Sequence, residues 1–343
     1  MERCRVWGLL WAFWALAIFS PVSSANANEP IALGQRDWDG SRAITYVLKD
    51  IIETRLGYPT RIVESNDAEI FAEMHRGNGR IDVLTDLWMP NQADQWAKYI
   101  DEHQSVAVNE QPYSGHQGLF IPGYIQDKYQ IRSVHDLANP DIAKLFDSDG
   151  DGKGEYWPGA LGWSSTHIEQ VKAKSYGYAP YFTPYIAPDR MFKAKLKADY
   201  ASEQGILFYY WTPEWIHAAY DLRRLEEPSF DGFAMASKKG APRYKADGCW
   251  NMILPRESTD WLNQSRVTCA WPDAKVYVAF SVSLIKRAPK VARFLKQVAF
   301  DADTVNEWIW QIGKQGREPA VVASEWVKAH PDIVKIWLAD IQP

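Results

Sequence analysis

The apolar positions in the first part of the chain alternate between short continuous runs and helical spacing. Residues 31–34 form an apolar run, and residues 41–58 carry apolar side chains three and four positions apart. A second strand is predicted at 59–65, followed by a helix that ends at Gly77 and a third strand at 80–88. This β-α-β-α-β order predicts a mainly parallel sheet with helices on its faces.

The same order recurs in the middle of the chain. Strands are predicted at 205–211 and 274–285, and the run that ends in Trp163 is taken as a strand that leads into a helix at 164–175. A helical tail begins at Pro289. Because no polar linker separates the parts, we expect a two-lobe α/β protein, with residues 28–120 plus 280–343 in lobe 1 and 121–279 in lobe 2.

The first residues have the organisation of a secretory signal peptide. Arg3 and Arg5 precede an apolar stretch at 6–19, and Ala25-Asn26-Ala27 is a small-residue cleavage site. Residues 1–27 are therefore predicted to be removed, and an uncleaved anchor is the alternative. The exported chain is expected to be a soluble periplasmic protein. With a net charge of −5 and no basic patch, a nucleic-acid partner is not expected.

Two cysteines remain after the predicted signal peptide, Cys249 and Cys269. An even number of cysteines in an exported chain favours a disulfide. Two unrelated buried thiols are the alternative. A metal site is disfavoured, because no histidine lies nearby at a usable spacing.

Tryptophan is unusually frequent, with 17 in the chain, and four of them stand at or just after the ends of predicted strands. Trp88, Trp163 and Trp211 each stand before a turn or a helix start, and Trp38 follows the first strand. Ligand groups in open α/β sheets lie at the carboxyl ends of strands. Converging indole rings would hold a cation, at about 2 kcal/mol per desolvated ring. The alternative is that each ring only fills the core.

The helix predicted after Trp163 adds a site for an anion. The first amides of a helix have no intrahelical partner, so those of Ser164 and Ser165 can bind a negative group. An ordinary serine cap is the other interpretation, and both can hold. A cage and an anion site together suit a small zwitterion with a fixed positive charge and a carboxylate.

Four motifs in this order carry a family resemblance: DVLTDLWMPNQ, NPDIAKLFDSDGDGKGE, PGALGWSSTHIEQ and LFYYWTPEW. From about Ile31 onward the chain resembles the substrate-binding proteins of glycine betaine, proline betaine and choline ABC importers. The resemblance weakens between Asp231 and Ala270. It implies a type II periplasmic binding protein fold, with two lobes that close on the ligand by a hinge.

The resemblance also implies roles for individual residues. Trp88, Trp163 and Trp211 match the aromatic box, and the amides of Ser164 and Ser165 match the carboxylate site. Trp38 resembles an additional Trp of choline-binding relatives. Gln92 stands where some betaine binders have a histidine, so the exact ligand is left open. Trp215 is expected to pack beneath Trp211.

The expected function is the capture of a quaternary ammonium osmolyte for an ABC permease, by a monomer without enzymatic activity or cofactor. Glycine betaine is the first candidate; proline betaine, choline, carnitine and dimethylsulfoniopropionate are the alternatives. Choline would require a nearby acid, for which Asp37 or Asp39 is expected. A secreted carbohydrate-active enzyme, whose Trp-lined cleft needs two carboxylates, is the rival of another class. A sensory binding subunit is a third alternative.

The stretch DSDGDGKGE resembles the first half of a calcium-binding EF-hand loop. Asp147, Asp149 and Asp151 have the spacing of its first ligands. The glutamate expected at its last position is absent, and Glu155 is the substitute. The sequence therefore predicts either a structural Ca²⁺ site or a polar turn that is solvated by its own side chains.

Overall fold

The computed structural model describes residues 29–235, 238–239 and 243–341. The predicted signal peptide and its cleavage site lie outside these residues. Within the described part of the chain, no helix is long and apolar enough to cross a membrane.

Ten strands of the described residues form one sheet, in the order β2-β1-β3-β12-β5-β8-β6-β7, with β4 beside β12 and β9 beside β5. These strands are β1 (Ile31–Gln35), β2 (Thr60–Glu64), β3 (Val83–Met89), β4 (Val106–Val108), β5 (Tyr113–Pro122), β6 (Gly154–Trp157), β7 (Phe182–Pro184), β8 (Leu207–Thr212), β9 (Leu222–Arg224) and β12 (Ala274–Ser281). A separate two-stranded sheet consists of β10 (Trp250–Asn251) and β11 (Arg266–Val267).

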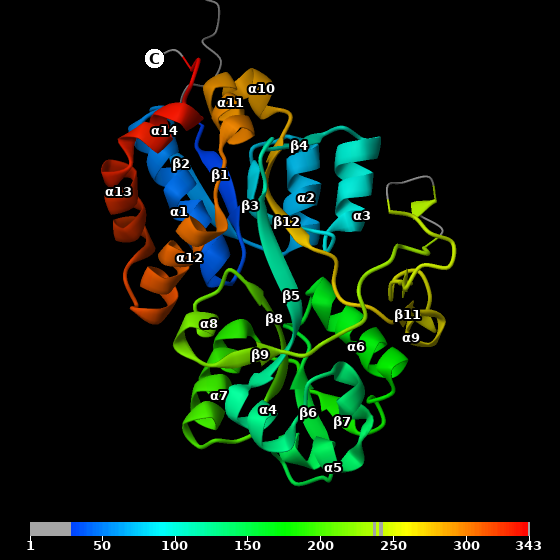
Figure 1. Ribbon diagram of the computed structural model, residues 1–343. Coiled ribbons are helices and arrows are strands. Elements are labelled where there is room, and N and C mark those ends of the chain that lie inside the picture. Colours follow the sequence, from blue (N-terminus) through cyan, green and yellow to red (C-terminus); the bar gives the residue numbers. More distant parts are fainter. Residues whose placement is uncertain (1–28, 236–237, 240–242, 342–343) are drawn as a thin grey trace, which may run out of the picture.

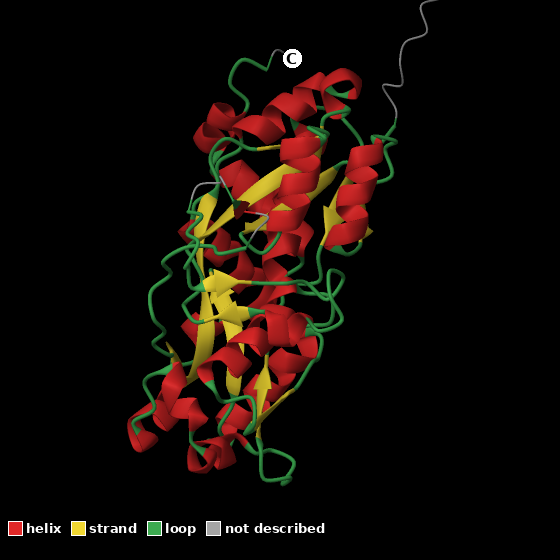
Figure 2. Cartoon of the chain, turned by 90° about the vertical axis from the view of Figure 1, so that its right-hand side faces the viewer, coloured by secondary structure: helices red, strands yellow, loops and turns green. Residues whose placement is uncertain are grey.

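The helices of the first half of the chain are α1 (Asp39–Thr54), α2 (Asp67–Arg76), α3 (Ala93–Gln95), α4 (Gly123–Tyr129), α5 (Pro140–Ala143), α6 (Ser164–Tyr176) and α7 (Asp189–Ala201). Those of the second half are α8 (Ile216–Ala219), α9 (Trp261–Gln264), α10 (Leu284–Arg287), α11 (Pro289–Gln297), α12 (Ala302–Ile309), α13 (Pro319–Ala329) and α14 (Pro331–Trp337). Figure 2 shows the helices flanking the strands along the whole length of the molecule.

The sheet is mixed rather than mainly parallel. The pairings β1–β2, β1–β3, β6–β7 and β6–β8 are parallel, as the β-α-β rhythm predicts. The strands β5 and β12 pair antiparallel to their neighbours and join the two parallel groups. In Figure 1, β5 runs from the upper group of elements into the lower group. We call the group around β1, β3 and α1 the first lobe and the group around β6, β8 and α6 the second lobe.

Burial on both faces explains the continuous apolar runs of the first lobe. In β3, Val83 contacts the larger core cluster that includes the apolar stripe of α1, whereas Leu84 belongs to the cluster around α2. Successive side chains of a strand point to opposite faces, so one strand supplies both cores. The sheet is thereby held between two helical layers, and the carboxyl end of β3 is directed toward the second lobe.

One strand prediction is wrong. Residues 158–163 form a loop with a turn at 160–163, and the strand of this region, β6, ends at Trp157. Gly159 and Gly162 have φ angles of 128° and 84°, which interrupt a strand. Trp163 therefore follows a glycine turn, not the end of a strand.

The predicted disulfide is confirmed: Cys249 and Cys269 are bonded, with their Cα atoms 5.8 Å apart. The bond closes the segment that contains β10, α9 and β11, which lies beside α6 in Figure 1.

Candidate functional site

Four indole rings meet between the two lobes. The ring centroid of Trp211 lies 5.4 Å from that of Trp163 and 6.3 Å from those of Trp38 and Trp88. The centroids of Trp38 and Trp163 are 5.4 Å apart. All of these pairs are edge-to-face, with interplanar angles of 67° to 82°. The rings therefore present several faces in different directions, which is the arrangement of an aromatic cage.

Local structure places one pair of rings at strand ends and the other pair at helix starts. Trp88 and Trp211 are the penultimate residues of β3 and β8. Trp38 and Trp163 directly precede the first residues of α1 and α6. The first lobe supplies Trp38 and Trp88, and the second lobe supplies Trp163 and Trp211, so the cage forms only where the lobes meet.

A glycine of β5 makes room for one ring of the cage. A Cβ atom on Gly115 would lie 2.6 Å from the indole of Trp88 and 2.9 Å from the carbonyl oxygen of Thr212. Both distances are shorter than a carbon atom tolerates. Close packing of Trp88 against the crossing strand therefore requires glycine at this position.

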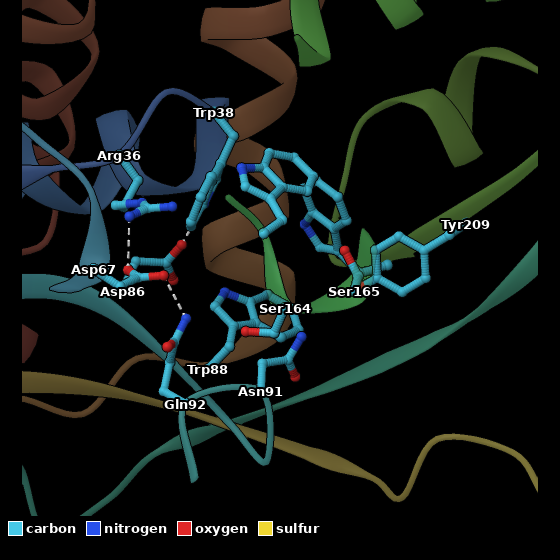
Figure 3. Close-up of a pocket in the computed structure, with 12 residues that line it drawn as sticks. Arg36, Trp38, Asp67, Asp86, Trp88, Asn91, Gln92, Ser164, Ser165 and Tyr209 are labelled. Carbon is cyan, nitrogen blue, oxygen red and sulfur yellow. Dashed lines mark hydrogen bonds and ion pairs between the residues drawn. The ribbon is translucent and has the colours of Figure 1, made fainter. Parts of the chain in front are cut away.

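The rings line a cavity of about 50 Å³ (Figure 3). Its lining residues are Arg36, Trp38, Asp67, Asp86, Trp88, Asn91, Gln92, Trp163, Ser164, Ser165, Tyr209 and Trp211. Seven of the eight residues predicted to bind the ligand are among them. The exception is Asp37, whose side chain is mostly exposed and pairs with Arg42 at 2.6 Å.

The buried acid of the cavity is Asp86. Its Oδ2 accepts a hydrogen bond of 2.5 Å from the indole nitrogen of Trp38, and its Oδ1 accepts one of 3.1 Å from the hydroxyl of Tyr113. Burial raises the pKa of Asp86 to about 6 against these hydrogen bonds, which lower it. The bond to Trp38 uses the polar edge of that ring, and Arg36 lies over one of its faces, so the other face is what remains for a ligand cation.

A second polar group lies on the other side of Trp38. The buried Arg36 pairs with Asp67 at 2.9 Å, and its guanidinium carbon lies 5.1 Å from the ring centroid of Trp38. Gln92 donates its amide hydrogen to Asp67 at 2.6 Å. Burial raises the pKa of Asp67, and Arg36 opposes that shift. Because Gln92 is already bonded to Asp67, its predicted hydrogen bond to a ligand carboxylate would have to compete with this contact.

The start of α6 also lines the cavity, and in Figure 3 Ser164 lies beside Trp88 while Ser165 lies beside Tyr209, on the side away from Arg36. These are the first two residues of the helix, whose amides have no intrahelical acceptor. The neighbouring wall is fixed by Gln117, which accepts hydrogen bonds from Tyr209 and, at 2.8 Å, from Asn91. The cavity thus has a carboxylate beside one end and helix amides at the other.

Sequence reasoning missed five of the lining residues as ligand contacts: Arg36, Asp67, Asp86, Asn91 and Tyr209. Asp86 could have been found, because it stands two positions before Trp88 in a strand, where alternate residues share a face. Arg36 and Asp67 follow different strands, and only the fold brings them together.

A charged cluster joins the lobes beside the cage, around Lys193 of α7. The ammonium nitrogen lies 2.7 Å from Asp39 of the first lobe, 2.9 Å from Asp189 and 3.5 Å from Glu214. Trp215 also binds Asp39, through its indole nitrogen at 3.0 Å. Trp215 is buried, but it belongs to this lobe contact and not to the lining of the cage.

Burial acts in opposite directions on the pKa of Glu214 and on the pKa of Lys193. It raises the pKa of Glu214 to about 8, against the attraction of Lys193. For Lys193, burial lowers the pKa, but Glu214, Asp189 and Asp39 together outweigh it and the pKa is raised. The lysine is therefore charged at neutral pH, with Glu214 largely protonated beside it.

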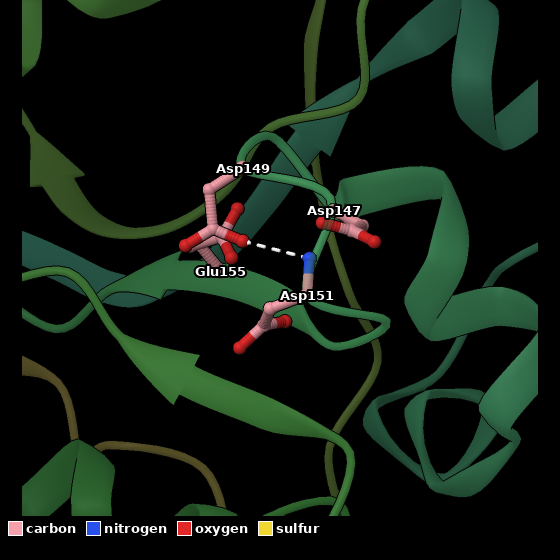
Figure 4. Close-up of side chains that lie close together, drawn as sticks. All are labelled: Asp147, Asp149, Asp151 and Glu155. Atoms are coloured by element: carbon pink, nitrogen blue, oxygen red, sulfur yellow. Dashed lines mark hydrogen bonds between the residues drawn. The ribbon is translucent and has the colours of Figure 1, made fainter.

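The acidic loop brings its four predicted carboxylates together, with one oxygen of each within 4.8 Å of the others (Figure 4). Each group also accepts hydrogen bonds from nearby backbone amides. Asp147 binds those of Gly150 and Gly152, and Glu155 binds that of Ser148. This geometry agrees with both predictions for the loop, the ion site and the self-solvated turn.

The profile of one protein family matches residues 29–329 of the chain: the substrate binding domain of ABC-type glycine betaine transport system. This is a family of binding domains and not of enzymes, so the carbohydrate-active enzyme is set aside.

Periplasmic binding proteins are similar over a shorter stretch. The glycine betaine-binding periplasmic protein OusX of Dickeya dadantii is 28% identical over 133 residues, which are 36% of this chain and 40% of that protein. The glycine betaine/proline betaine-binding periplasmic protein of Escherichia coli is 29% identical over the same length and shares of the two chains. The match thus spans about 40% of the length of these relatives.

Solved structures share the fold over nearly the whole chain. An ABC-transporter choline binding protein in complex with choline has a TM-score of 0.67 and 18% identity, covering 91% of this chain and 92% of that one. A lactococcal OpuAC in its closed-liganded conformation with glycine betaine has a TM-score of 0.66 and 18% identity, covering 91% and 100%. The predicted two-lobe binding-protein fold is confirmed.

Proposed function

Because the chain belongs to the family of substrate-binding domains of ABC-type glycine betaine transport systems, we propose that it captures a quaternary ammonium compound for an ABC importer. The observation that carries this proposal is the meeting of four indole rings from two lobes around a buried carboxylate. An onium head has no hydrogen to donate, so ring faces and a nearby negative charge are the groups that stabilise it.

Glycine betaine is the first candidate ligand. Its carboxylate would bind the amides of Ser164 and Ser165 at the start of α6, while its trimethylammonium head lies against the rings. Similarity to glycine betaine-binding proteins supports this choice.

Choline is the second candidate, because a specific observation favours it. Asp86 lines the cavity and would supply the acid that a choline site requires, for which the sequence predicted Asp37 or Asp39. A cation without a carboxylate of its own gains more from Asp86 than a zwitterion does. Carnitine, proline betaine and dimethylsulfoniopropionate offer the same kind of head and remain alternatives.

The ligand is proposed to enter by movement of the two lobes, with residues 28–120 plus 280–343 in one and 121–279 in the other. The antiparallel strands β5 and β12 join the lobes and are the proposed hinge. We further propose a periplasmic monomer, exported by the signal peptide at 1–27, whose rims contact a membrane permease. The relatives named above are periplasmic proteins.

Calorimetric titration of the purified chain with glycine betaine and choline, side by side, tests this function. Binding of either compound, with a dissociation constant below the millimolar range, is expected. Tighter binding of glycine betaine would favour the Ser164–Ser165 amides as the deciding contact, and tighter binding of choline would favour Asp86. If a folded sample binds none of the onium compounds named here, the proposal fails.

A structural Ca²⁺ ion in the acidic loop remains a separate proposal. The four carboxylates of Asp147, Asp149, Asp151 and Glu155 would hold it. Calcium titration followed by thermal unfolding should raise the melting temperature if the ion binds. An unchanged temperature at millimolar calcium would leave the polar turn as the explanation.

A further inference from the structure

A second and larger cavity lies next to the aromatic cage. Its volume is about 580 Å³, compared with about 50 Å³ for the cage. The two cavities share part of their lining: Asp67, Asn91, Gln92, Trp163 and Ser164 contribute to both. A ligand whose head fills the cage therefore has a larger space directly beside it. We call this space the side chamber.

Three parts of the chain form the side chamber. The first lobe contributes the residues around Pro90 and α3, and the second lobe contributes the start of α6. The third wall comes from the segment that the disulfide closes, with Trp250, Met252 and Leu254. The family resemblance is weakest in this segment, so the wall is a feature of this chain that the family motifs do not explain.

Apolar and aromatic side chains form one part of the third wall, beside the charged Arg256 and Glu257. The ring centroids of Trp250 and Trp271 are 5.2 Å apart, and Phe233 packs against Trp250 at 6.1 Å. Leu161, at the mouth of the chamber, leaves 86% of its side chain exposed. A leucine so exposed at a cavity mouth gains free energy when an apolar group covers it.

The third wall is held in place without a ligand. The ammonium group of Lys174 donates to the carbonyl oxygens of Leu262 and Ser265, at 2.6 Å each. Trp271 donates its indole hydrogen to Glu169 of α6 at 2.6 Å. These bonds attach the segment to the second lobe, and the disulfide closes it. Because the segment is already ordered, binding of a ligand costs little conformational entropy there.

One exposed ion pair connects the third wall to the first lobe. Arg256 lies 2.7 Å from Asp94 of α3. The wall therefore spans the opening between the lobes while its main attachment is to one of them. A ligand group in the chamber would contact both lobes and the segment between them.

We infer that the side chamber is a subsite for an apolar tail, and that the protein accepts trimethylammonium compounds with a chain of several carbons. This inference rests on the proposed function, because the head must first bind the cage. The tail would lie against Leu161, Leu254 and the Trp250 side of the chamber. The polar residues at its rim, such as Asn66 and Glu257, stay accessible to water or to a polar end group.

A series of alkyltrimethylammonium ions tests the inference by calorimetry: tetramethyl, ethyl-, butyl- and hexyltrimethylammonium. The head is constant, so only the tail changes. If the tail is buried, each added methylene should tighten binding about fourfold, the equivalent of about 0.8 kcal/mol. A dissociation constant that does not change with chain length, or that rises, would overturn the subsite and leave the cage intact.

Failure of the proposed function gives a different result. In that case neither tetramethylammonium nor choline nor glycine betaine binds, whatever the chain length, and both proposals are overturned together.

A substitution in the third wall tests whether the alkyl tail of the ligand lies in the side chamber. Leu254→Ser should weaken the binding of hexyltrimethylammonium at least fivefold. It should change the dissociation constant of tetramethylammonium less than twofold, because Leu254 lines the chamber and not the cage. Ile336→Ser is the matched control, since Ile336 is an exposed apolar residue of α14. Equal effects of Leu254→Ser on both ions, or none on the hexyl compound, would contradict the placement.

Discussion

Two contacts join the lobes through consecutive residues of the first lobe, and they differ in chemistry. Trp38 meets the rings of Trp163 and Trp211, whereas Asp39 meets Lys193 and Trp215. In both contacts the first-lobe residue is buried, and the second lobe adds a buried indole, Trp211 or Trp215, beside the partly buried Trp163 or Lys193. One is therefore an aromatic surface and the other an ionic cluster, although their first-lobe residues are neighbours in the chain.

The difference lies in where the balancing charge comes from. In the ionic cluster the protein itself supplies a cation, Lys193, to the acids Asp39, Asp189 and Glu214. In the cage, Asp86 has hydrogen-bond donors but no lysine or arginine partner in the part of the chain that the structure describes. The first contact is complete without a ligand, while the second gains a cation when an onium compound binds. The comparison separates a structural lobe contact from a binding one.

Among the variants considered, removal of the Lys193 side chain should have the largest effect, and this effect should be on the stability of the fold. Lys193→Met leaves buried carboxylates without their cation, which typically costs about 3–5 kcal/mol in the free energy of unfolding. Denaturant unfolding measures it. Lys195→Met is the matched control in the same helix: its partner Asp199 lies at 2.9 Å in a more exposed pair, which is worth about 1 kcal/mol or less. Similar losses in both variants would show that the cluster is not a strong lobe contact.

Removal of a cage ring should act on binding. Trp211→Ala is expected to weaken the binding of glycine betaine and of choline about 30-fold, because one desolvated ring contributes about 2 kcal/mol to the binding free energy. Trp211→Phe keeps a ring and should recover part of the affinity. Trp326→Ala removes a buried ring of α13 outside the cage, so it should lower stability but leave the dissociation constant unchanged. Unchanged affinity in Trp211→Ala would exclude this ring from the site.

The charge of Asp86 should appear in the pH dependence of binding. Protonation removes the negative charge, so the affinity for choline should fall as the pH drops through about 6 and be constant above about 7. Asp86→Asn should bind choline on the order of tenfold more weakly at pH 8. Calorimetry from pH 5 to 8 measures both.

Variants of two neighbouring acids are the controls for assigning the pH dependence of binding to Asp86. Asp67 also has a raised pKa, but it is paired with Arg36, and Asp67→Asn should leave the step near pH 6 in place. Asp37→Asn should change nothing, because that side chain is exposed. A pH step that survives in Asp86→Asn would assign the titration to another group.

The smallest effect is expected at Glu214. Its pKa of about 8 means that the carboxyl is neutral at pH 6, so Glu214→Gln should change the free energy of unfolding there by less than about 1 kcal/mol. A carboxyl with a raised folded pKa contributes stability that is complete below its unfolded value of 4.5 and is lost as the pH rises through about 8. Unfolding from pH 5 to 9 should therefore show a decline in the wild type that is reduced in the variant. A steep decline in both would refute this assignment.

Much of the cage was predictable from local rules. Alternation of apolar runs and helical stripes located β3, β8 and α6, and with them Trp88, Trp211 and Ser164. Trp163 was placed correctly beside α6 for a reason that was partly wrong, because the residues before it form a glycine turn and not a strand. The position of the ring was still predicted correctly, because it depends on where α6 begins and not on whether a strand precedes it.

The partners of the rings could not be predicted in the same way. The hydrogen bond from Trp38 to Asp86 joins residues 48 positions apart, and the contact of Lys193 with Asp39 joins residues 154 positions apart. Asp37 and Asp39 were equal candidates in the sequence. The turn after β1 exposes the first and buries the second, which only the packed structure decides.

The sequence by itself determined the class of fold, the disulfide, and the aromatic and amide groups that a zwitterionic ligand would need. These features depend on periodicity, on residue type and on position relative to nearby strand and helix ends. The tertiary structure decided which acid faces the cage, which acids surround Lys193, and that the disulfide segment encloses a chamber beside the site. Those outcomes depend on the antiparallel crossing strands, whose pairing sets how the two lobes face each other and leaves no periodic signal in the sequence.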